Sequence, residues 1–184
     1  MSDRSQILPS DDVSALTGDL APLQSLMEPN VAPQQVGAVL AEIFHVQPTE
    51  VALLRLESGA LRFLFPDQLR TAGTIPVSST TVAAHTAASK KSEIFNNFAR
   101  VKHASIFESI RLDGESLDQP EPAPIQKLMS APVMDEDSRV LGVVQVSRKG
   151  LDPSYAGADF SREDLHELEL AATVLASSNF MQTS

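Results

Sequence analysis

The sequence predicts an α+β protein built on one antiparallel sheet. Two segments, 51–65 and 128–147, each contain two apolar runs separated by a short polar turn, which is the pattern of a β-hairpin. Amphipathic helices are expected near the two ends of the chain, over 33–45 and 162–180. Hairpins join antiparallel strands, and amphipathic helices must bury their apolar stripes on a sheet face. We therefore expect a central antiparallel sheet of five or six strands.

The chain begins with an acidic segment, residues 1–31, that prolines interrupt. Apolar residues recur in it at alternating steps of three and four, the spacing of a narrow helical seam. Pro22 would cost a continuous helix about 3 kcal/mol, so we expect one or two short helices that pack on the body or on a partner chain. We treat 1–31 as an acidic N-terminal extension and 32–184 as the main domain.

The first regular helix is expected over 33–45. Pro33 suits its first turn, where a missing N–H costs nothing, and Pro48 ends it. Two strands follow at 51–56 and 61–65, joined by a short turn that contains a glycine, and they form the first hairpin.

Short elements alternate with polar turns in the rest of the chain. The Ser/Thr run at 78–81 either caps a following helix or donates hydrogen bonds to a ligand, and we favour capping. The loop at 113–124 is polar, acidic and proline-rich, and it is long for a compact domain. The expected elements are strands at 73–77, 94–97, 128–134 and 140–147, a helix at 79–89 and a helical turn at 104–110.

The last helix, expected over 162–180, has a complete set of start signals. Ser161 is placed to cap it, and Asp164 is placed to bond back to the cap and to face the positive end of the helix dipole. Phe160 and Leu165 lie where a hydrophobic staple would form.

Charge is distributed unevenly along the chain. The net charge of −10 disfavours nucleic acid and anionic membranes as partners. Residues 51–112 are the exception, since eight basic and four acidic residues give that stretch a net charge of +4. This stretch would attract an anionic ligand, although basic residues more commonly lie on a solvent-exposed face without a ligand. The basic residues concerned are Arg55, Arg62, Arg70, Lys90 and Lys91.

Several kinds of site are excluded by composition. The chain has no cysteine, which excludes disulfides, thiolate metal sites, thiol nucleophiles and attachment of a cofactor to sulfur. No apolar run approaches the roughly 20 residues needed to cross a bilayer, and the N-terminus lacks a signal pattern, so we expect a cytoplasmic protein. The most plausible metal pair, His103 with Glu108, lacks ligand spacing, and we expect neither a metal site nor catalytic residues.

Three motifs follow one another in the C-terminal third. They are S-A-P-V at 130–133, V-L-G-V-V-Q-V at 140–146 and F-S-R-E-D-L at 160–165, and I-F-N-N at 94–97 precedes them. Their order and spacing resemble the S-x-P, G-V-hydrophobic and F-[ST]-x-x-D pattern of the GAF domain family, and the resemblance covers about residues 33–180.

This resemblance implies N- and C-terminal helices on one face of the sheet, often forming a dimer bundle, and loops and short helices over a small-molecule pocket on the other. Family members sense cyclic nucleotides, bind tetrapyrroles or other metabolites, or act as dimer scaffolds, and a cysteine-bearing branch reduces sulfoxides. Because the chain lacks cysteine, tetrapyrrole attachment and the reductase activity are not expected, and we predict a non-enzymatic domain.

The strand at 140–147 predicts which face carries the pocket. Side chains alternate across a sheet, so aliphatic Val140, Val144 and Val146 suit the helix-covered side. Leu141, Val143, Gln145 and Ser147 then face the loop-covered side, where a buried glutamine needs a hydrogen-bond partner.

Aromatic residues flank two neighbouring amides at 95–98, a mixture typical of a ligand pocket. The alternative, which stays open, is a turn whose asparagines satisfy backbone groups. The candidate ligand-binding residues are Phe95, Asn96, Asn97, Phe107, Ser130, Gln145 and Ser147.

Two functions fit these features. The first is a regulatory module that binds an unidentified small metabolite, orders residues 95–124 around it, dimerises through its terminal helices and signals to a separate output protein. The second is a ligand-free structural dimer module whose pocket is filled by Phe98 or Phe107. An enzyme of unknown type fits less well, because no nucleophile–base set or metal set is visible in the sequence.

Overall fold

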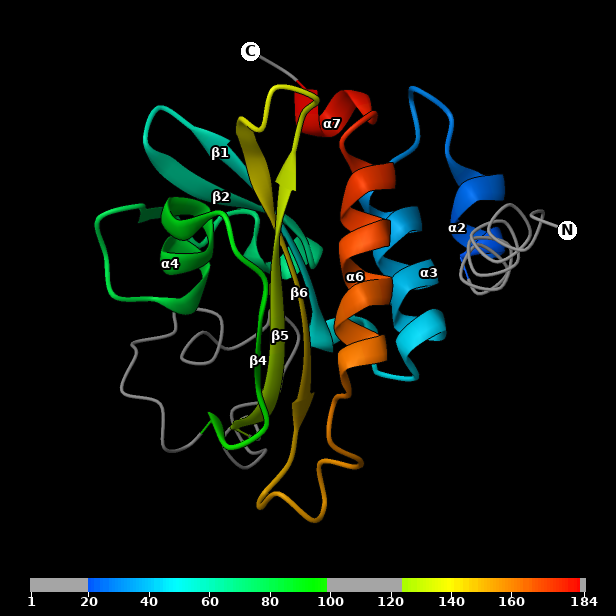
Figure 1. Cartoon of the computed structure of the whole chain (residues 1–184), viewed down its shortest axis with the longest axis vertical. Helices are drawn as coiled ribbons and strands as arrows, with labels where there is room; N and C mark the ends of the chain where they lie inside the picture. The colour runs from blue at the N-terminus through cyan, green and yellow to red at the C-terminus, as the bar shows by residue number, and fades with distance from the viewer. Residues whose placement is uncertain (1–19, 99–123, 183–184) are drawn as a thin grey trace, which may run out of the picture.

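The computed structural model describes residues 20–98 and 124–182 and contains one six-stranded sheet in the order β3-β2-β1-β6-β5-β4 (Figure 1). Every strand pair is antiparallel, as the two hairpin patterns predict. The predicted fold class is therefore confirmed. The strands are β1 (Val51–Glu57), β2 (Ala60–Phe65), β3 (Thr74–Pro76), β4 (Glu93–Phe95), β5 (Ile125–Met134) and β6 (Val140–Lys149).

Helices cover both faces of this sheet. Figure 1 shows α3 (Pro33–Phe44) and α6 (Arg162–Leu175) together on one side, and α4 (Val82–Ser89) on the other. Within the described ranges no helix is both long and apolar enough to span a bilayer. The shorter helices are α2 (Ala21–Leu26), α7 (Asn179–Gln182) and the 3-10 turns η1 (Pro48–Glu50) and η2 (Asp67–Leu69).

The two faces of the sheet build two separate apolar cores. The helix-side core joins α3 and α6 to the sheet and includes Leu40, Leu53, Met129, Val144 and Leu168. The α4-side core includes Leu54, Phe63, Val82, Leu128 and Val143. Neighbouring residues of one strand enter different cores because side chains alternate across a sheet.

A β-bulge in β6 corrects one part of the predicted alternation. Pairing with β5 passes from Val133 opposite Gly142 to Met134 opposite Val140, so Leu141 is an extra residue. An extra residue reverses the alternation beyond it. Val140 consequently packs on the α4-side core and Leu141 on the helix-side core, the reverse of the prediction.

The start of α6 is as predicted, but its end is not. Ser161 Oγ accepts from the Asp164 amide at 3.1 Å, and Asp164 Oδ2 accepts from the Ser161 amide at 2.8 Å, which completes the capping box. The helix ends at Leu175 rather than near residue 180. The hydroxyls of Ser177 and Ser178 donate to backbone carbonyls one turn back, a local bonding pattern that competes with helix continuation.

The short helix α2 packs on the body of the protein. Its Leu23 and the preceding Leu20 are buried in the helix-side core. The helical turn expected at 104–110 and nearly all of the long loop at 113–124 lie outside the described residues.

The close approach of β6 to β1 at Gly142 can be tested directly by mutation. A Cβ at Gly142 would lie 2.0 Å from the carbonyl oxygen of Leu54 on β1. Gly142→Ala should therefore force the central strands apart and destabilise the fold by about 3 kcal/mol, measured by urea unfolding. Gly59→Ala is the comparison, because its Cβ would meet nothing within 4 Å. Only its positive φ of 80° opposes the change, and it should cost about 1 kcal/mol. Equal losses would contradict the steric explanation.

Candidate functional site

A buried chain of polar side chains lies between the sheet and α4. Ser130 on β5 is directly opposite Gln145 on β6, and both are buried. Gln145 Nε2 donates to Ser130 Oγ at 3.1 Å, and Ser130 Oγ lies 2.7 Å from Thr86 Oγ1 on α4. Two of the predicted site residues are therefore brought together.

The direction of these hydrogen bonds follows from their last member. Thr86 Oγ1 donates to the carbonyl of Val82 at 2.9 Å, so its single proton is used within α4. The Ser130 hydroxyl must then donate to Thr86, which leaves its oxygen free to accept from Gln145. We call Thr86, Ser130 and Gln145 the polar triad.

Thr86 is the member that the sequence analysis missed. It is fully buried in the otherwise aliphatic face of α4, among residues such as Ala83 and Ala87. A hydroxyl in an alanine-rich helical face was the available signal, because buried polar groups require partners.

Ser147 and Phe95 extend this face toward the far end of the sheet. Leu128 pairs with both of them, with Ser147 on β6 and with Phe95 on β4. Ser147 is fully buried and donates to the carbonyl of Glu50 at 3.1 Å. Phe95 meets Phe98 edge-on at 6.4 Å between ring centroids, and Phe98 is buried. The face thus joins apolar walls to a few polar groups.

The two asparagines have different positions. Asn96 Nδ2 donates to the carbonyl of Phe160 at 3.0 Å, and Asn96 Oδ1 accepts from the Phe160 amide at 2.8 Å. Asn97 is exposed in the same turn. The turn ends β4 at Phe95, so the strand is shorter than predicted. Phe107 lies outside the described residues.

No group of three or more potential metal ligands gathers in the part of the chain that the structure describes. His85 Nε2 lies 3.0 Å from Glu93 Oε1, a contact between α4 and β4 that is an ion pair only when the histidine is protonated. The pair His103 and Glu108 lies outside the described residues. Thr81 caps α4 by accepting from the Ala84 amide at 3.1 Å, as favoured for the Ser/Thr run.

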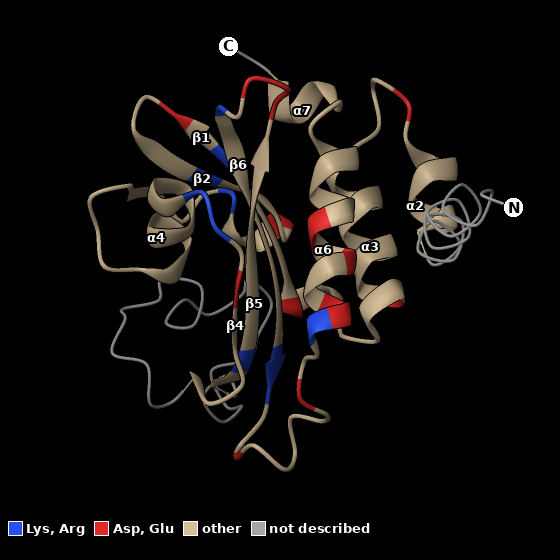
Figure 2. Cartoon of the chain, viewed as in Figure 1, with Lys and Arg blue, Asp and Glu red and all other residues tan. Residues whose placement is uncertain are grey.

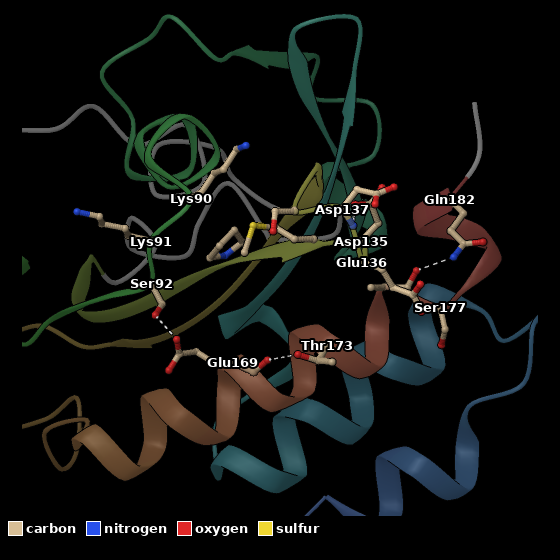
Figure 3. Close-up of a pocket in the computed structure, with 14 residues that line it drawn as sticks. Lys90, Lys91, Ser92, Asp135, Glu136, Asp137, Glu169, Thr173, Ser177 and Gln182 are labelled. Atoms are coloured by element: carbon tan, nitrogen blue, oxygen red, sulfur yellow. Dashed lines mark hydrogen bonds between the residues drawn. The ribbon is translucent and has the colours of Figure 1, made fainter.

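A separate open pocket of about 950 Å³ lies at the opposite end of β5 (Figure 3). Lys90 and Lys91 line one side of it, and the acidic β5–β6 turn around Glu136 lines another. Figure 3 shows Lys91 extending away from that acidic turn, and Ser92 donating to Glu169 of α6 at 2.8 Å. None of the predicted ligand-binding residues that the structure describes lines this pocket.

The fold has known counterparts. No family model matches the sequence, and no curated protein matches it. Among solved structures, the GAF domain of an Acinetobacter phosphoenolpyruvate-protein phosphotransferase is 12% identical, with 89% of each chain covered and a TM-score of 0.62. A Burkholderia vietnamiensis protein described as a GAF sensor is 14% identical, with 94% of this chain and 96% of that chain covered and a TM-score of 0.58. This chain therefore has the GAF fold.

One expectation is corrected by a third similarity. A free methionine-R-sulfoxide reductase from Neisseria meningitidis, solved with its substrate, is 16% identical, with 80% of this chain and 75% of that chain covered and a TM-score of 0.55. The prediction of a non-enzymatic domain is wrong, because enzymes are among the proteins that share this fold. At this identity the similarity extends to the fold alone.

The polar triad predicts a measurable coupling between α4 and the sheet. Thr86→Val leaves the buried Ser130 hydroxyl without its acceptor and should cost about 1–3 kcal/mol. Ser130→Ala should cost a similar amount, and the double variant should cost less than the sum by at least about 0.5 kcal/mol. Urea unfolding of the four proteins gives this coupling energy. Additive losses would contradict a connected triad.

The asparagine pair offers a matched comparison. Asn96→Ala removes two hydrogen bonds that join the β4 turn to the residue before the cap of α6. It should destabilise the protein by about 1–3 kcal/mol. Asn97→Ala, one residue away and exposed, should change stability by less than about 0.5 kcal/mol. Thermal unfolding in parallel checks both, and equal effects would contradict a structural role specific to Asn96.

Proposed function

We propose that this chain is a cytoplasmic regulatory domain that binds a small metabolite on the α4 side of its sheet. The observation that carries the proposal is the buried polar triad on that face. Purely structural packing favours apolar residues, such as those of the helix-side core, because every buried polar group must find a partner. Ser130 and Gln145 offer such partners to a ligand that displaces part of the triad.

The ligand site in this proposal extends from the triad along the row to Phe95 and Ser147. Phe95 and Leu128 supply apolar walls, and a ligand that displaces Ser130 would take up the hydrogen bond that Gln145 Nε2 donates. A ligand beside Phe95 acts on α6 through the neighbouring Asn96, whose side chain makes two hydrogen bonds to the Phe160 backbone. The hydrogen-bonded turn thus connects the ligand face with the helix face.

Dimerisation through α3 and α6 completes the proposed mechanism. These helices carry partly buried apolar residues beyond those that fill the core, namely Val39, Ile43, Leu170 and Val174. A change in the start of α6 then alters a helical interface, and a separate output protein reads the change.

A ligand-free structural dimer is the second candidate. It is favoured by Phe98, which is only 3% exposed and packs within the α4-side core. A ring in that position fills space that a ligand would otherwise use.

Native mass spectrometry of freshly purified protein distinguishes the two candidates. The sensing proposal predicts a retained small molecule that is lost on collisional activation, and a Gln145→Leu variant that retains at least tenfold less of it. Gln126→Leu is the matched control, because Gln126 is also buried but donates to the Gly150 carbonyl outside the triad. A ligand-free dimer in every preparation would favour the structural alternative. Equal retention of the small molecule by both variants would exclude Gln145 from the ligand site.

A further inference from the structure

Three arginines that are separated in sequence converge beside one pocket on the helix side of the sheet. The pocket has a volume of about 550 Å³ and is lined by Arg55 of β1, Arg62 of β2 and Arg70, which follows η2. Pro33 at the start of α3 and Phe180 of α7 form part of its wall. Arg55 Nη1 donates to the Phe180 carbonyl at 3.1 Å, which places it on the face opposite the polar triad.

The arrangement of Arg55 and Arg62 is unfavourable without a further partner. The two residues are directly opposite each other on neighbouring antiparallel strands. Like charges in that position destabilise a sheet. Glu57 compensates in part, since it pairs with Arg55 and its Oε2 lies 3.6 Å from Arg62 Nε.

Much of the hydrogen-bonding capacity of these arginines remains unused. Each guanidinium carries five N–H donors. Within the described ranges, the buried Nε of Arg55 has no hydrogen-bond partner. The side chains of Arg62 and Arg70 are 53% and 59% exposed, and their ion pairs, at 3.6 and 3.9 Å, exceed hydrogen-bond length. The exposed guanidinium groups of Arg62 and Arg70 are therefore accessible to a ligand that enters the pocket.

Charge and shape select the chemistry of a ligand. Three arginines exceed the two nearby carboxylates, Glu57 and Asp67, in a chain whose net charge is −10. Blue segments in Figure 2 mark basic residues on β1 and β2. The guanidinium fork matches the paired oxygens of a phosphate or carboxylate. The positive end of the α3 dipole at Pro33 adds to this field, and Leu64 contributes an apolar wall.

We propose that the Arg55–Arg62–Arg70 pocket binds the phosphate or carboxylate group of a small metabolite, at a site separate from the one under "Proposed function". The oxyanion is held by the guanidinium groups of Arg62 and Arg70, with Arg55 at the base of the pocket. The apolar wall formed by Pro33, Leu64 and Phe180 receives the body of the ligand.

Inorganic phosphate, phenyl phosphate and benzoate are suitable probes at a constant ionic strength set with sodium chloride. At ten times its dissociation constant, a bound probe should raise the melting temperature of the chain by about 3–6 °C, and the rise should then grow with the logarithm of the probe concentration. A larger rise with phenyl phosphate than with benzoate at equal concentration assigns the site to phosphate esters, and the reverse order assigns it to carboxylates. The absence of such a rise with all three probes overturns the proposal.

The test variant is Arg62→Gln with Arg70→Gln, because both side chains are more than half exposed and removing them leaves the core intact. It should lose the stabilisation. Lys90→Gln with Lys91→Gln removes the same charge outside this pocket and should keep it. An equal response of the two variants overturns the proposal, since it would indicate a general charge effect.

Two further variants distinguish the effect of charge from that of guanidinium geometry, and the arginine pocket from the polar triad. Arg62→Lys with Arg70→Lys keeps the charge but removes the guanidinium fork, so it should retain less than half of the shift, and full retention overturns bidentate recognition. Gln145→Leu should respond to phosphate as the unaltered chain does. A lost response in that variant overturns the assignment to the helix-side pocket, whereas failure to find a ligand at the triad leaves the phosphate result standing.

Discussion

The alternation of side chains along β5 and β6 is the constraint on which the two-sided architecture depends. Met129 and Val144 enter the helix-side core, while their neighbours Ser130 and Gln145 face α4. A slip of one residue would carry both polar side chains beneath α3 and α6, where each unpaired group would cost about 1–3 kcal/mol. The polar triad thus fixes the register of the central strands as well as lining a candidate site.

The sequence was sufficient to predict the features that depend on local or periodic patterns. The hairpins, the capping box at Ser161 and the antiparallel sheet follow from turn chemistry and from a period of two. A glycine inside the strand, Gly142, was a local signal for a bulge or a close backbone approach, and both are present. The reversed alternation of Val140 and Leu141 was not predicted, because it depends on the exact position of the extra residue in the pairing with β5. The early end of α6 had a local signal, the consecutive Ser177 and Ser178, which competes weakly with apolar periodicity.

The candidate site shows the same division between local and distant information. Strand alternation placed Gln145 and Ser147 on the face that α4 covers. The role of Asn96 depends on the Phe160 backbone, which is 64 residues away in sequence, so the choice between ligand contact and turn could not be made from its neighbours. The prediction of a non-enzymatic domain failed because one fold supports different chemistries, so a resemblance in fold does not exclude catalysis.

The arginine pocket adds a physical route between ligand binding and the helical face. A ligand on the α4 side must act on the helices through the sheet or through Asn96, whereas the arginine pocket is bordered by α3 and α7 themselves. Glu57 already pairs with Arg55 and lies near Arg62, so an oxyanion must compete with this carboxylate for the guanidinium groups. That competition limits affinity and makes the site selective for ligands that engage several arginines at once. The lining residues come from β1, β2, α3 and α7, so the proposed ligand would contact the sheet and the helix termini together and thereby influence the helical surface.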